Sequence, residues 1–360
     1  MEITIIGAGH GGTAAAGALA IKGHRINLLE TNKNPHADHF TMLQDTLKLQ
    51  VKGMYGDQAV ALNCVTTEPA EVIPSSDAIL VYMVTNYHHI PAEKTAGLLK
   101  DNQMVYICPG YLGTLLFLKE MKKQGNGSNV IFAEGETLPH SSRILEPGVV
   151  NITSGNRRHP VAVYPHSRRE EGAEILQKLL GDVYLDDSLL EASLHNPNLL
   201  IHTIGILMNM SRVEDPNGHF SMYRNGFSPS VWKVVKALDE EKMAVLDRVG
   251  AKRQTYFEKF MFRSFEQYQD MEEMDGFKKY ADTSSPGPFS VNHRYITEDV
   301  PMGLGLLHYL GKHLGIGTPM ADMLIRLAST VLEQDFFNQI RTHTDYGFEG
   351  FEEWLAFLKK

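Results

Sequence analysis

The segment Ile3-Thr4-Ile5-Ile6-Gly7-Ala8-Gly9-His10-Gly11-Gly12, near the start of the chain, decides the fold. Its β-branched half predicts a strand, and the alanine-rich segment Thr13–Ile21 that follows the glycines predicts a helix. A second strand is predicted at Arg25–Glu30, which completes a βαβ unit of about 30 residues. Glycines in a GxGxxG pattern between a strand and a helix are typical of a dinucleotide-binding turn.

Each glycine of this turn has its own task. We expect Gly7 to permit the tight turn, Gly9 to let the backbone approach a pyrophosphate, and Gly12 to let the helix pack closely on the strand. The free N–H groups at the helix N-terminus favour the phosphate anions. The predicted cofactor contacts in the turn are Gly7, Ala8, Gly9, His10, Gly11 and Gly12. A glycine-rich turn without a ligand is the alternative, and the flanking strand, helix and acidic residue disfavour it.

The acidic residue is Glu30, which ends the second predicted strand roughly 20 residues after the turn. A carboxylate at this place accepts hydrogen bonds from the adenosine ribose hydroxyls and repels a 2′-phosphate, so it favours NAD as the cofactor. Two alternatives stay open. Lys33 could bind the 2′-phosphate of NADP, and Glu30 could be an exposed residue at a strand end.

Four more strands are predicted in the first half of the chain, at Ala78–Met83, Met104–Cys108, Asn129–Ala133 and Pro160–Tyr164. Segments of helical character separate several of them, so we expect an α/β Rossmann domain with a doubly wound, mostly parallel sheet. Ligands of such sheets bind at the carboxyl edge of the strands. Further cofactor contacts are therefore expected just after two of these strands, at Val84, Thr85 and Pro109.

The second half of the chain has the sequence pattern of helices rather than of alternating strands and helices. Helices are predicted at Ser188–Arg212, Ser230–Gln269, Met302–Leu314 and Pro319–Asp335, without a convincing strand. We therefore place a domain boundary near Asp186-Asp187. Residues 1–187 are predicted to form the dinucleotide-binding domain, and residues 188–360 an all-α substrate and catalytic domain.

The apolar segment Leu194–Met210 carries a line of polar residues. They share one helical stripe and are Asn198, His202, Gly205 and Asn209, with His195 on nearly the same face. An exposed helix would carry lysine and glutamate on its polar side, so we expect a mostly buried helix whose stripe faces a cleft. His202 could transfer a proton near neutral pH, or it could be a histidine satisfied within the core.

A second dense polar segment is Asn292–Pro301. Arg294 could hold a substrate carboxylate by a bidentate pair, and Asp299 could orient a histidine and raise its pKa by stabilising the protonated form. The alternatives are structural. Asp299 could cap the helix that begins near Pro301, and Arg294 could pair with Glu298 on the surface.

Composition excludes several classes of function. The 360 residues carry a net charge of -9, which argues against nucleic acid as a partner, and no apolar run reaches the roughly 20 residues that span a bilayer. Only two cysteines, Cys64 and Cys108, are present, and Glu2 stands where a signal peptide would be basic, so we expect a cytoplasmic protein. The histidines form no metal-ligand motif, and His88-His89 is expected to be a solvated pair.

Together these motifs resemble the opine dehydrogenase family, of the octopine/nopaline dehydrogenase type, over nearly the whole chain. The resemblance rests on the glycine motif, on Asn198-Leu-Leu-Ile-His202, and on Gly287-Pro288 followed by Arg294-Tyr295-x-x-Glu298-Asp299-Val300-Pro301. It continues through Gly315-Ile316-Gly317-Thr318-Pro319 and Leu324-Ile325-Arg326-Leu327-Ala328. The most specific feature is the step from Arg294 to Asp299 within the Glu-Asp-Val-Pro turn.

The resemblance implies a Rossmann domain joined to a helical domain of the 6-phosphogluconate dehydrogenase C-terminal type, with the active site in the cleft between them. It implies that an α-keto acid condenses with the amino group of an amino acid, and that NAD(P)H reduces the imine to a secondary amine dicarboxylate. Carried over, His202 is the acid/base, Asp299 holds and polarises it, Arg294 binds a substrate carboxylate and Asn198 helps to define the pocket. A homodimer through the helical domain is compatible with the sequence, which does not fix it.

Two other functions are weighed against this one. A two-domain 2-hydroxy-acid or ketopantoate-type dehydrogenase typically uses a lysine as the acid, and the helix with Asn198 and His202 has no lysine nearby. A non-catalytic dinucleotide-binding redox sensor predicts a degraded catalytic set, whereas His202, Arg294 and Asp299 are all present.

Overall fold

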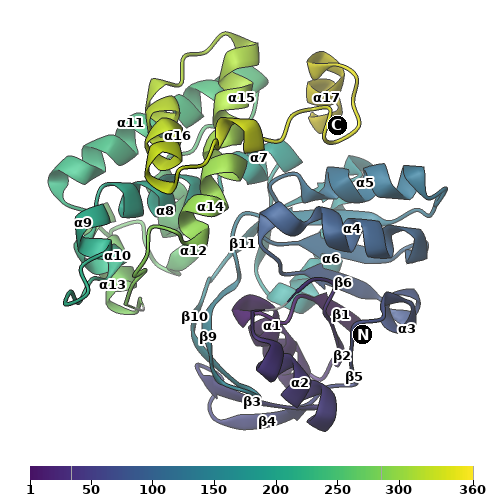
Figure 1. Ribbon diagram of the computed structural model, residues 1–360. Coiled ribbons are helices and arrows are strands. Elements are labelled where there is room, and N and C mark those ends of the chain that lie inside the picture. Colours follow the sequence, from purple (N-terminus) through teal and green to yellow (C-terminus); the bar gives the residue numbers. More distant parts are fainter. Residues whose placement is uncertain (34, 285, 360) are drawn as a thin grey trace. The chain divides into compact units, whose positions relative to one another are not determined.

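The computed structural model describes residues 1–33, 35–284 and 286–359 (Figure 1). Contacts divide the chain into two compact units, Met1–Leu189 and Leu190–Lys359. The first unit combines strands and helices, and the second consists of helices.

The main sheet of the first unit is mostly parallel, as predicted. In the described part of the chain it has eight strands in the order β12-β11-β8-β7-β6-β1-β2-β5. Neighbouring strands run parallel except β8 and β11, which are antiparallel. The strands are β1 (Glu2–Ile6), β2 (Arg25–Leu29), β5 (Cys64–Thr66), β6 (Ala78–Val81), β7 (Met104–Ile107), β8 (Ile131–Gly135), β11 (His159–Tyr164) and β12 (Val183–Leu185).

The helices of this unit connect the strands in the doubly wound manner. They are α1 (His10–Ile21), α2 (Ala37–Thr46), α3 (Pro69–Val72), α4 (His89–Thr95), α5 (Gly113–Lys123) and α6 (Arg169–Leu180). The sheet order extends from β1 in both directions, to β2 on one side and to β6 on the other. Such a reversal of strand order is the place where open α/β sheets bind ligands.

A second sheet was not predicted from the sequence. It has the order β4-β3-β10-β9, with β3 (Lys48–Gly53), β4 (Gln58–Ala61), β9 (His140–Glu146) and β10 (Val149–Gly155). The pairing of β3 with β10 joins segments far apart in the chain, for example Val51 opposite Val150. A local sequence pattern carries no information about this long-range pairing. The hairpins β3–β4 and β9–β10 that it joins are local, and they were not predicted either.

Helix α1 lies between the two sheets. It contacts β1 and β2 of the main sheet and β3, β9 and β10 of the second one. A Cβ atom at Gly17 would lie 2.5 Å from Cγ2 of Val51, so the helix and β3 pack with no room for a side chain. The alanine-rich sequence of Thr13–Ile21 is therefore explained by close packing on two sides.

The second unit is all-α, as predicted. Its helices are α7 (Leu189–Leu194), α8 (Asn198–Leu207), α9 (Met210–Val213), α10 (Met222–Asn225), α11 (Pro229–Val249), α12 (Tyr256–Ser264), α13 (Glu273–Asp282), α14 (Arg294–Thr297), α15 (Gly305–Leu314), α16 (Pro319–Leu332) and α17 (Phe351–Leu358). A π-helical turn over Val300–Leu304 precedes α15. Among the described residues, the β-type pairing in this unit is limited to an isolated bridge between Ser221 and Gly287.

Two of the predicted long helices are interrupted. The segment Ser188–Arg212 breaks before Asn198, where Pro197 precedes α8. The segment Ser230–Gln269 breaks at Gly250, which has a left-handed φ of 75° and ends α11. A capping box formed by Thr255 and Glu258 then begins α12. The breaks follow the ordinary proline and glycine signals, which the long-helix prediction passed over.

Candidate active site

The glycine turn of the first unit has the geometry of a close backbone approach. Gly7 has a φ of +105°, and a Cβ there would lie 2.5 Å from the carbonyl oxygen of Tyr82. A Cβ at Gly12 would overlap the carbonyl oxygen of Gly7. By contrast, a Cβ at Gly9 would meet none of the described atoms within 4 Å. Gly7 and Gly12 are therefore required by the fold itself, while Gly9 borders open space.

The N-termini of α1 and α5 differ in their side-chain caps. Among the described residues, no side chain caps α1 at Gly9. At α5 the buried carboxylate of Glu134 accepts hydrogen bonds from the backbone N–H groups of Leu112, at 2.9 Å, and Thr114, at 2.7 Å. The Glu134 carboxylate thus caps α5, whereas the described structure shows no side-chain cap at the glycine-rich N-terminus of α1, the kind of helix end that binds phosphate.

Glu30 is not the exposed strand-end residue of the alternative interpretation. It is 9% exposed, and its Oε2 accepts a hydrogen bond of 3.1 Å from the backbone N–H of Ala8 in the glycine turn. Burial raises the pKa of Glu30, and the N–H groups of Ala8 and Asn32 oppose that shift. The carboxylate therefore lies against the glycine turn, while Lys33 is exposed.

The remaining predicted cofactor contacts follow strand ends at one edge of the sheet. The last residues of β1, β6 and β7 are in register, Ile6 opposite Val81 and Val81 opposite Ile107. The segments after these strands hold Val84, which is partly exposed, and Thr85 and Pro109, which are buried. The order of the strands thus brings these three residues to the same edge as the glycine turn.

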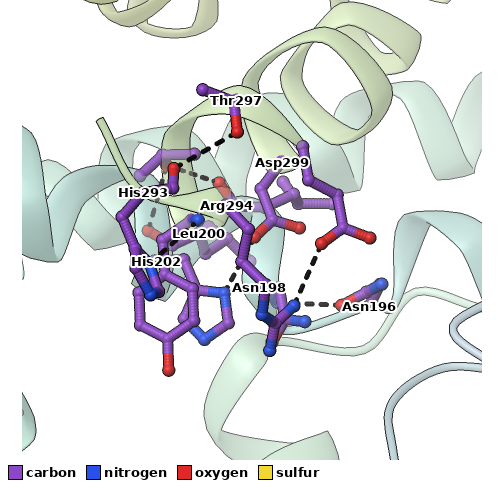
Figure 2. A network of polar contacts seen from close by, with 12 residues as sticks. Asn196, Asn198, Leu200, His202, His293, Arg294, Thr297 and Asp299 are labelled. Carbon is purple, nitrogen blue, oxygen red and sulfur yellow. Dashed lines mark hydrogen bonds and ion pairs between the residues drawn. The ribbon is translucent and has the colours of Figure 1, made fainter. Parts of the chain in front are cut away.

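The second unit brings together His202 and Asp299, which are far apart in the chain. Nδ1 of His202 on α8 and Oδ2 of Asp299 are 2.8 Å apart, and both residues are buried (Figure 2). Asp299 follows α14, a single turn that begins at Arg294, is capped by the His293 side chain and packs on α8. Within the described chain, its side chain makes no capping hydrogen bond to the helical turn that follows, so the helix-cap alternative is wrong. A carboxylate that binds Nδ1 fixes the tautomer and orientation of the imidazole.

Two tyrosines complete the surroundings of His202, and the sequence analysis missed both. The hydroxyl of Tyr223 on α10 lies 3.1 Å from Nε2 of His202. The ring of Tyr295 is stacked on the imidazole, with 3.4 Å between ring centroids and 12° between planes. Tyr295 adjoins the predicted Arg294, but nothing in the local sequence around Tyr223 marks it as a partner of α8.

The protonation of His202 differs from the expectation drawn from Asp299. Burial lowers its pKa well below the ordinary value, and the nearby Arg294 guanidinium lowers it further. Glu298 acts in the opposite direction, with a smaller effect. The predicted rise of the pKa is therefore wrong for the protein without ligands, in which the neutral imidazole is favoured.

Arg294 forms an ion pair with Glu298, but the pair is not a simple surface one. Nη1 of Arg294 and Oε2 of Glu298 are 3.0 Å apart, and the glutamate side chain is 1% exposed against 38% for the arginine. The Glu298 carboxylate raises the pKa of Arg294 although burial opposes the charge. The guanidinium is also 5.2 Å from the ring of Tyr295. The buried Glu298 carboxylate thus holds the Arg294 guanidinium in place, and the arginine side chain stays partly exposed.

The polar stripe of α8 divides into two parts. Asn198 is partly exposed at the start of the helix, and its N–H donates to Oδ1 of Asn196 at 3.0 Å. Gly205 and Asn209 instead pack on the segment around α10: a Cβ at Gly205 would lie 2.6 Å from Sδ of Met222, and Asn209 donates to the carbonyl oxygen of Gly226. The expectation of a stripe that faces a cleft is therefore wrong for these two residues.

Two histidine expectations also need correction. His195 lies before the break at Pro197 and not on α8, and its Nε2 is 3.0 Å from the carbonyl oxygen of Lys252. His88 is buried, with Nε2 3.2 Å from the carbonyl oxygen of Met83, so it is not half of a solvated pair. Two adjacent histidines are polar, so the sequence favoured exposure of both. Tertiary packing buries His88 instead.

Within the described ranges, no group of three or more His, Cys, Asp or Glu residues could hold a metal ion. A search of the same residues for a helix long and apolar enough to cross a membrane found none.

Comparisons with known proteins agree with this arrangement. Residues 185–332 match the family model of the NAD/NADP octopine/nopaline dehydrogenase alpha-helical domain. An opine dehydrogenase of Arthrobacter sp. (strain 1C) is 24% identical over 96% of this chain and 95% of its own. Octopine dehydrogenase in complex with NADH and agmatine has a similar fold, with a TM-score of 0.77 and 17% identity over 100% of this chain and 98% of the other. Yersinopine dehydrogenase with NADP⁺ bound gives a TM-score of 0.68 and 14% identity, over 100% and 98%.

The fold and these matches define the class of the protein, an NAD(P)-dependent oxidoreductase. Within that class, residues 185–332 match the helical domain of the octopine/nopaline dehydrogenases, and the resemblance to the opine dehydrogenase family is confirmed.

Proposed function

We propose that the protein catalyses the NAD(P)H-dependent reductive condensation of an α-keto acid with the amino group of an amino acid, and the reverse oxidation. The product is an opine, a secondary amine with two carboxylates. The observation that carries the proposal is the buried His202–Asp299 pair beside the partly exposed Arg294, all within the segment that matches the opine dehydrogenase helical domain.

We assign binding of the dinucleotide cofactor to the first unit. The glycine-rich N-terminus of α1, which no described side chain caps, would bind the pyrophosphate, with the turn from Gly7 to Gly12 around it. Glu30 would bind the adenosine ribose, and Val84, Thr85 and Pro109 would lie along the cofactor at the sheet edge. When bound, the dinucleotide supplies or accepts the hydride.

The second unit is assigned the proton chemistry and the substrate. Condensation requires a proton at the carbonyl oxygen and removal of one from nitrogen, which suits a histidine held by a carboxylate. His202 is the acid/base and Asp299 its positioning partner. Arg294 would bind a substrate carboxylate through the guanidinium edge that Glu298 does not use, and Asn198 would border the substrate.

The choice between NADH and NADPH depends on Glu30. Its carboxylate lies at the glycine turn, where a 2′-phosphate would meet a second negative charge, so we propose NADH as the preferred cofactor. The similar dehydrogenases have been solved with NADH in one case and NADP⁺ in the other, which leaves the preference to this chain's own residues.

A matrix of α-keto acids against amino acids, with NADH consumption as the readout, tests the function and identifies the substrates. We expect consumption only when both substrates are present. Consumption with a keto acid alone would indicate a 2-hydroxy-acid or ketopantoate-type dehydrogenase. Binding of NADH without consumption in any combination would indicate a non-catalytic redox sensor.

We also propose a cytoplasmic location and a homodimer. Cys64 and Cys108 are both free thiols, as expected in the reducing cytoplasm. A homodimer through the helical domain stays a prediction, which sedimentation analysis of the purified chain tests.

A further inference from the structure

Both ring nitrogens of His202 are engaged by the protein. Nδ1 is 2.8 Å from Asp299, and Nε2 is 3.1 Å from the hydroxyl of Tyr223. The ring of Tyr295 covers one face of the imidazole. With His202 only 3% exposed, a substrate atom that exchanges a proton with Nε2 must either displace the Tyr223 hydroxyl or act through it.

Tyr223 is held firmly and is partly exposed, unlike His202. Its neighbour Arg224 donates hydrogen bonds to the carbonyl oxygens of Ala281, at 3.1 Å, and Asp282, at 2.5 Å. The ring of Tyr223 also packs edge-on against Tyr280, with 5.3 Å between centroids. These contacts fix α10 and make displacement of the hydroxyl costly, so the substrate is expected to meet Tyr223 first.

The direction of the hydrogen bonds follows from the chemistry of the three groups. A carboxylate only accepts, so the proton between His202 and Asp299 is on Nδ1. In a neutral imidazole the other nitrogen then has a lone pair, and the Tyr223 hydroxyl donates to it. The chain of contacts runs from Asp299 through His202 to the hydroxyl of Tyr223, a residue that is less buried than His202.

We propose that Tyr223 is a catalytic residue that passes the proton between His202 and the substrate. The proposal rests on the proposed opine dehydrogenase function, and it adds a residue that the family resemblance did not supply.

In the direction of condensation, the step is loss of water from the carbinolamine. The phenolic O–H bond of Tyr223 breaks and an O–H bond forms on the leaving hydroxyl group. The C–O bond breaks, water leaves, and the nitrogen lone pair forms the C=N bond of a protonated imine, which keeps the N–H proton and takes the positive charge that the imidazolium gives up. The proton on Nε2 of the His202 imidazolium moves to the tyrosine oxygen, so both side chains end neutral, in the arrangement that the structure has. Tyr223 never becomes a phenolate, which its burial would disfavour.

The competing interpretation gives Tyr223 a passive part. In that case it only occupies Nε2 until the substrate displaces it. The variant Tyr223→Phe separates the two, because it keeps the ring that packs on Tyr280 and removes only the hydroxyl. If Tyr223 relays the proton, this variant lacks the group that carries it, and kcat falls. If the substrate displaces the hydroxyl, the variant has no hydroxyl to displace, and kcat does not fall.

The experiment compares wild-type enzyme with Tyr223→Phe in the substrate matrix. Tyr184→Phe, at an exposed tyrosine on strand β12, is the control for loss of a tyrosine hydroxyl. We expect kcat to fall roughly 100-fold in Tyr223→Phe, as for loss of a general acid, with KM for the keto acid and NADH affinity nearly unchanged. In mixtures of H₂O and D₂O, kcat of the wild type should depend non-linearly on deuterium content, because two protons move, and this curvature should vanish in the variant.

An active wild type together with a Tyr223→Phe variant of equal or higher kcat overturns the relay and leaves the proposed function intact. A wild type that consumes NADH in no substrate combination overturns both.

Discussion

Glu298 and Asp299 are consecutive buried residues whose carboxylates hold different partners, Arg294 and His202 respectively. The π-helical turn that begins at Val300 follows them directly. One turn of backbone therefore sets the position of both the guanidinium and the imidazole. A shift in this turn would move the proposed carboxylate site and the proposed acid/base together.

The first prediction concerns Arg294. A lysine presents one point charge and cannot make two parallel hydrogen bonds, so Arg294→Lys should raise the KM for one substrate more than tenfold, about 1.4 kcal/mol or more. Glu298→Gln should change the same KM in the same direction, because it removes the charge that holds Arg294. Steady-state kinetics with each substrate varied measures both. Arg253→Lys, at an exposed ion pair with Asp247, is the control. Wild-type KM values in Arg294→Lys would leave the arginine with a structural role only.

The second prediction concerns the pair of His202 and Asp299. His202→Ala should lose roughly 10²–10⁴-fold in turnover and still bind NADH. Because burial lowers the pKa of His202, the neutral base should persist, and oxidation of the opine continue, on the acid side of the ordinary histidine range near pH 6.5. Asp299→Asn removes a carboxylate that favours the imidazolium, so the acid limb of the pH–rate profile should move to still lower pH. An unmoved profile at wild-type turnover in Asp299→Asn would contradict the pairing.

The third prediction isolates the cofactor turn from the fold. Gly9 has a φ of −79°, which alanine adopts freely, and among described atoms a Cβ there has no neighbour within 4 Å. Gly9→Ala should therefore keep the unfolding midpoint but lose about tenfold or more in NADH affinity, because only a bound pyrophosphate would contact the new methyl group. Gly127→Ala, which also borders open space in the described structure, is the matched control. Unchanged NADH affinity in Gly9→Ala would place the cofactor elsewhere.

The fourth prediction concerns cofactor preference. Glu30→Gln keeps an oxygen that can accept from the Ala8 N–H and removes the negative charge. We expect the ratio of NADPH to NADH affinity to rise about tenfold, since a 2′-phosphate no longer meets a carboxylate. Fluorescence titration with both cofactors decides the matter. A wild type that binds NADPH as tightly as NADH would instead point to Lys33.

The fifth prediction is a pH-dependent stability from His39. Its Nδ1 accepts from the N–H of Gly148 at 3.0 Å, its Nε2 lies 3.2 Å from Oγ1 of Thr13, and burial lowers its pKa to about 4. The unfolded chain binds this proton near pH 6.5, so the contribution is complete above that pH and is lost as the pH falls toward 4. The full loss is on the order of 3 kcal/mol. The urea midpoint should drop less between pH 7 and pH 5 in His39→Gln than in wild type or in the exposed control His166→Gln. Equal drops would contradict the assignment.

The local pattern of apolar runs and turn residues was enough to predict four central strands of the main sheet. The bounds of β1, β2, β6 and β7 were predicted to within two residues, because each is a short apolar run next to a turn signal. The pair of β3 and β10 was missed because its stabilisation comes from a partner about a hundred residues away.

The residues of the candidate site also fall into those that the sequence could predict and those that it could not. His202 could be named from helical spacing and from one family motif, and Arg294 and Asp299 from a second one. Tyr223 could not, because its importance arises from the packing of α10 on α8. The pKa of His202 was predicted in the wrong direction because a sequence shows the carboxylate partner but neither the depth of burial nor the nearby guanidinium.

Helix α1, enclosed by two sheets, also limits how this chain can diverge in evolution. Every methyl group added to its middle would have to separate the layers on either side, as the contact between Gly17 and Val51 shows. Substitutions that survive there should be confined to glycine, alanine, serine and threonine, while the surface of β4 can drift freely. Lineages of this protein should therefore preserve the small-residue composition of Thr13–Ile21 longer than they preserve any charged residue outside the site.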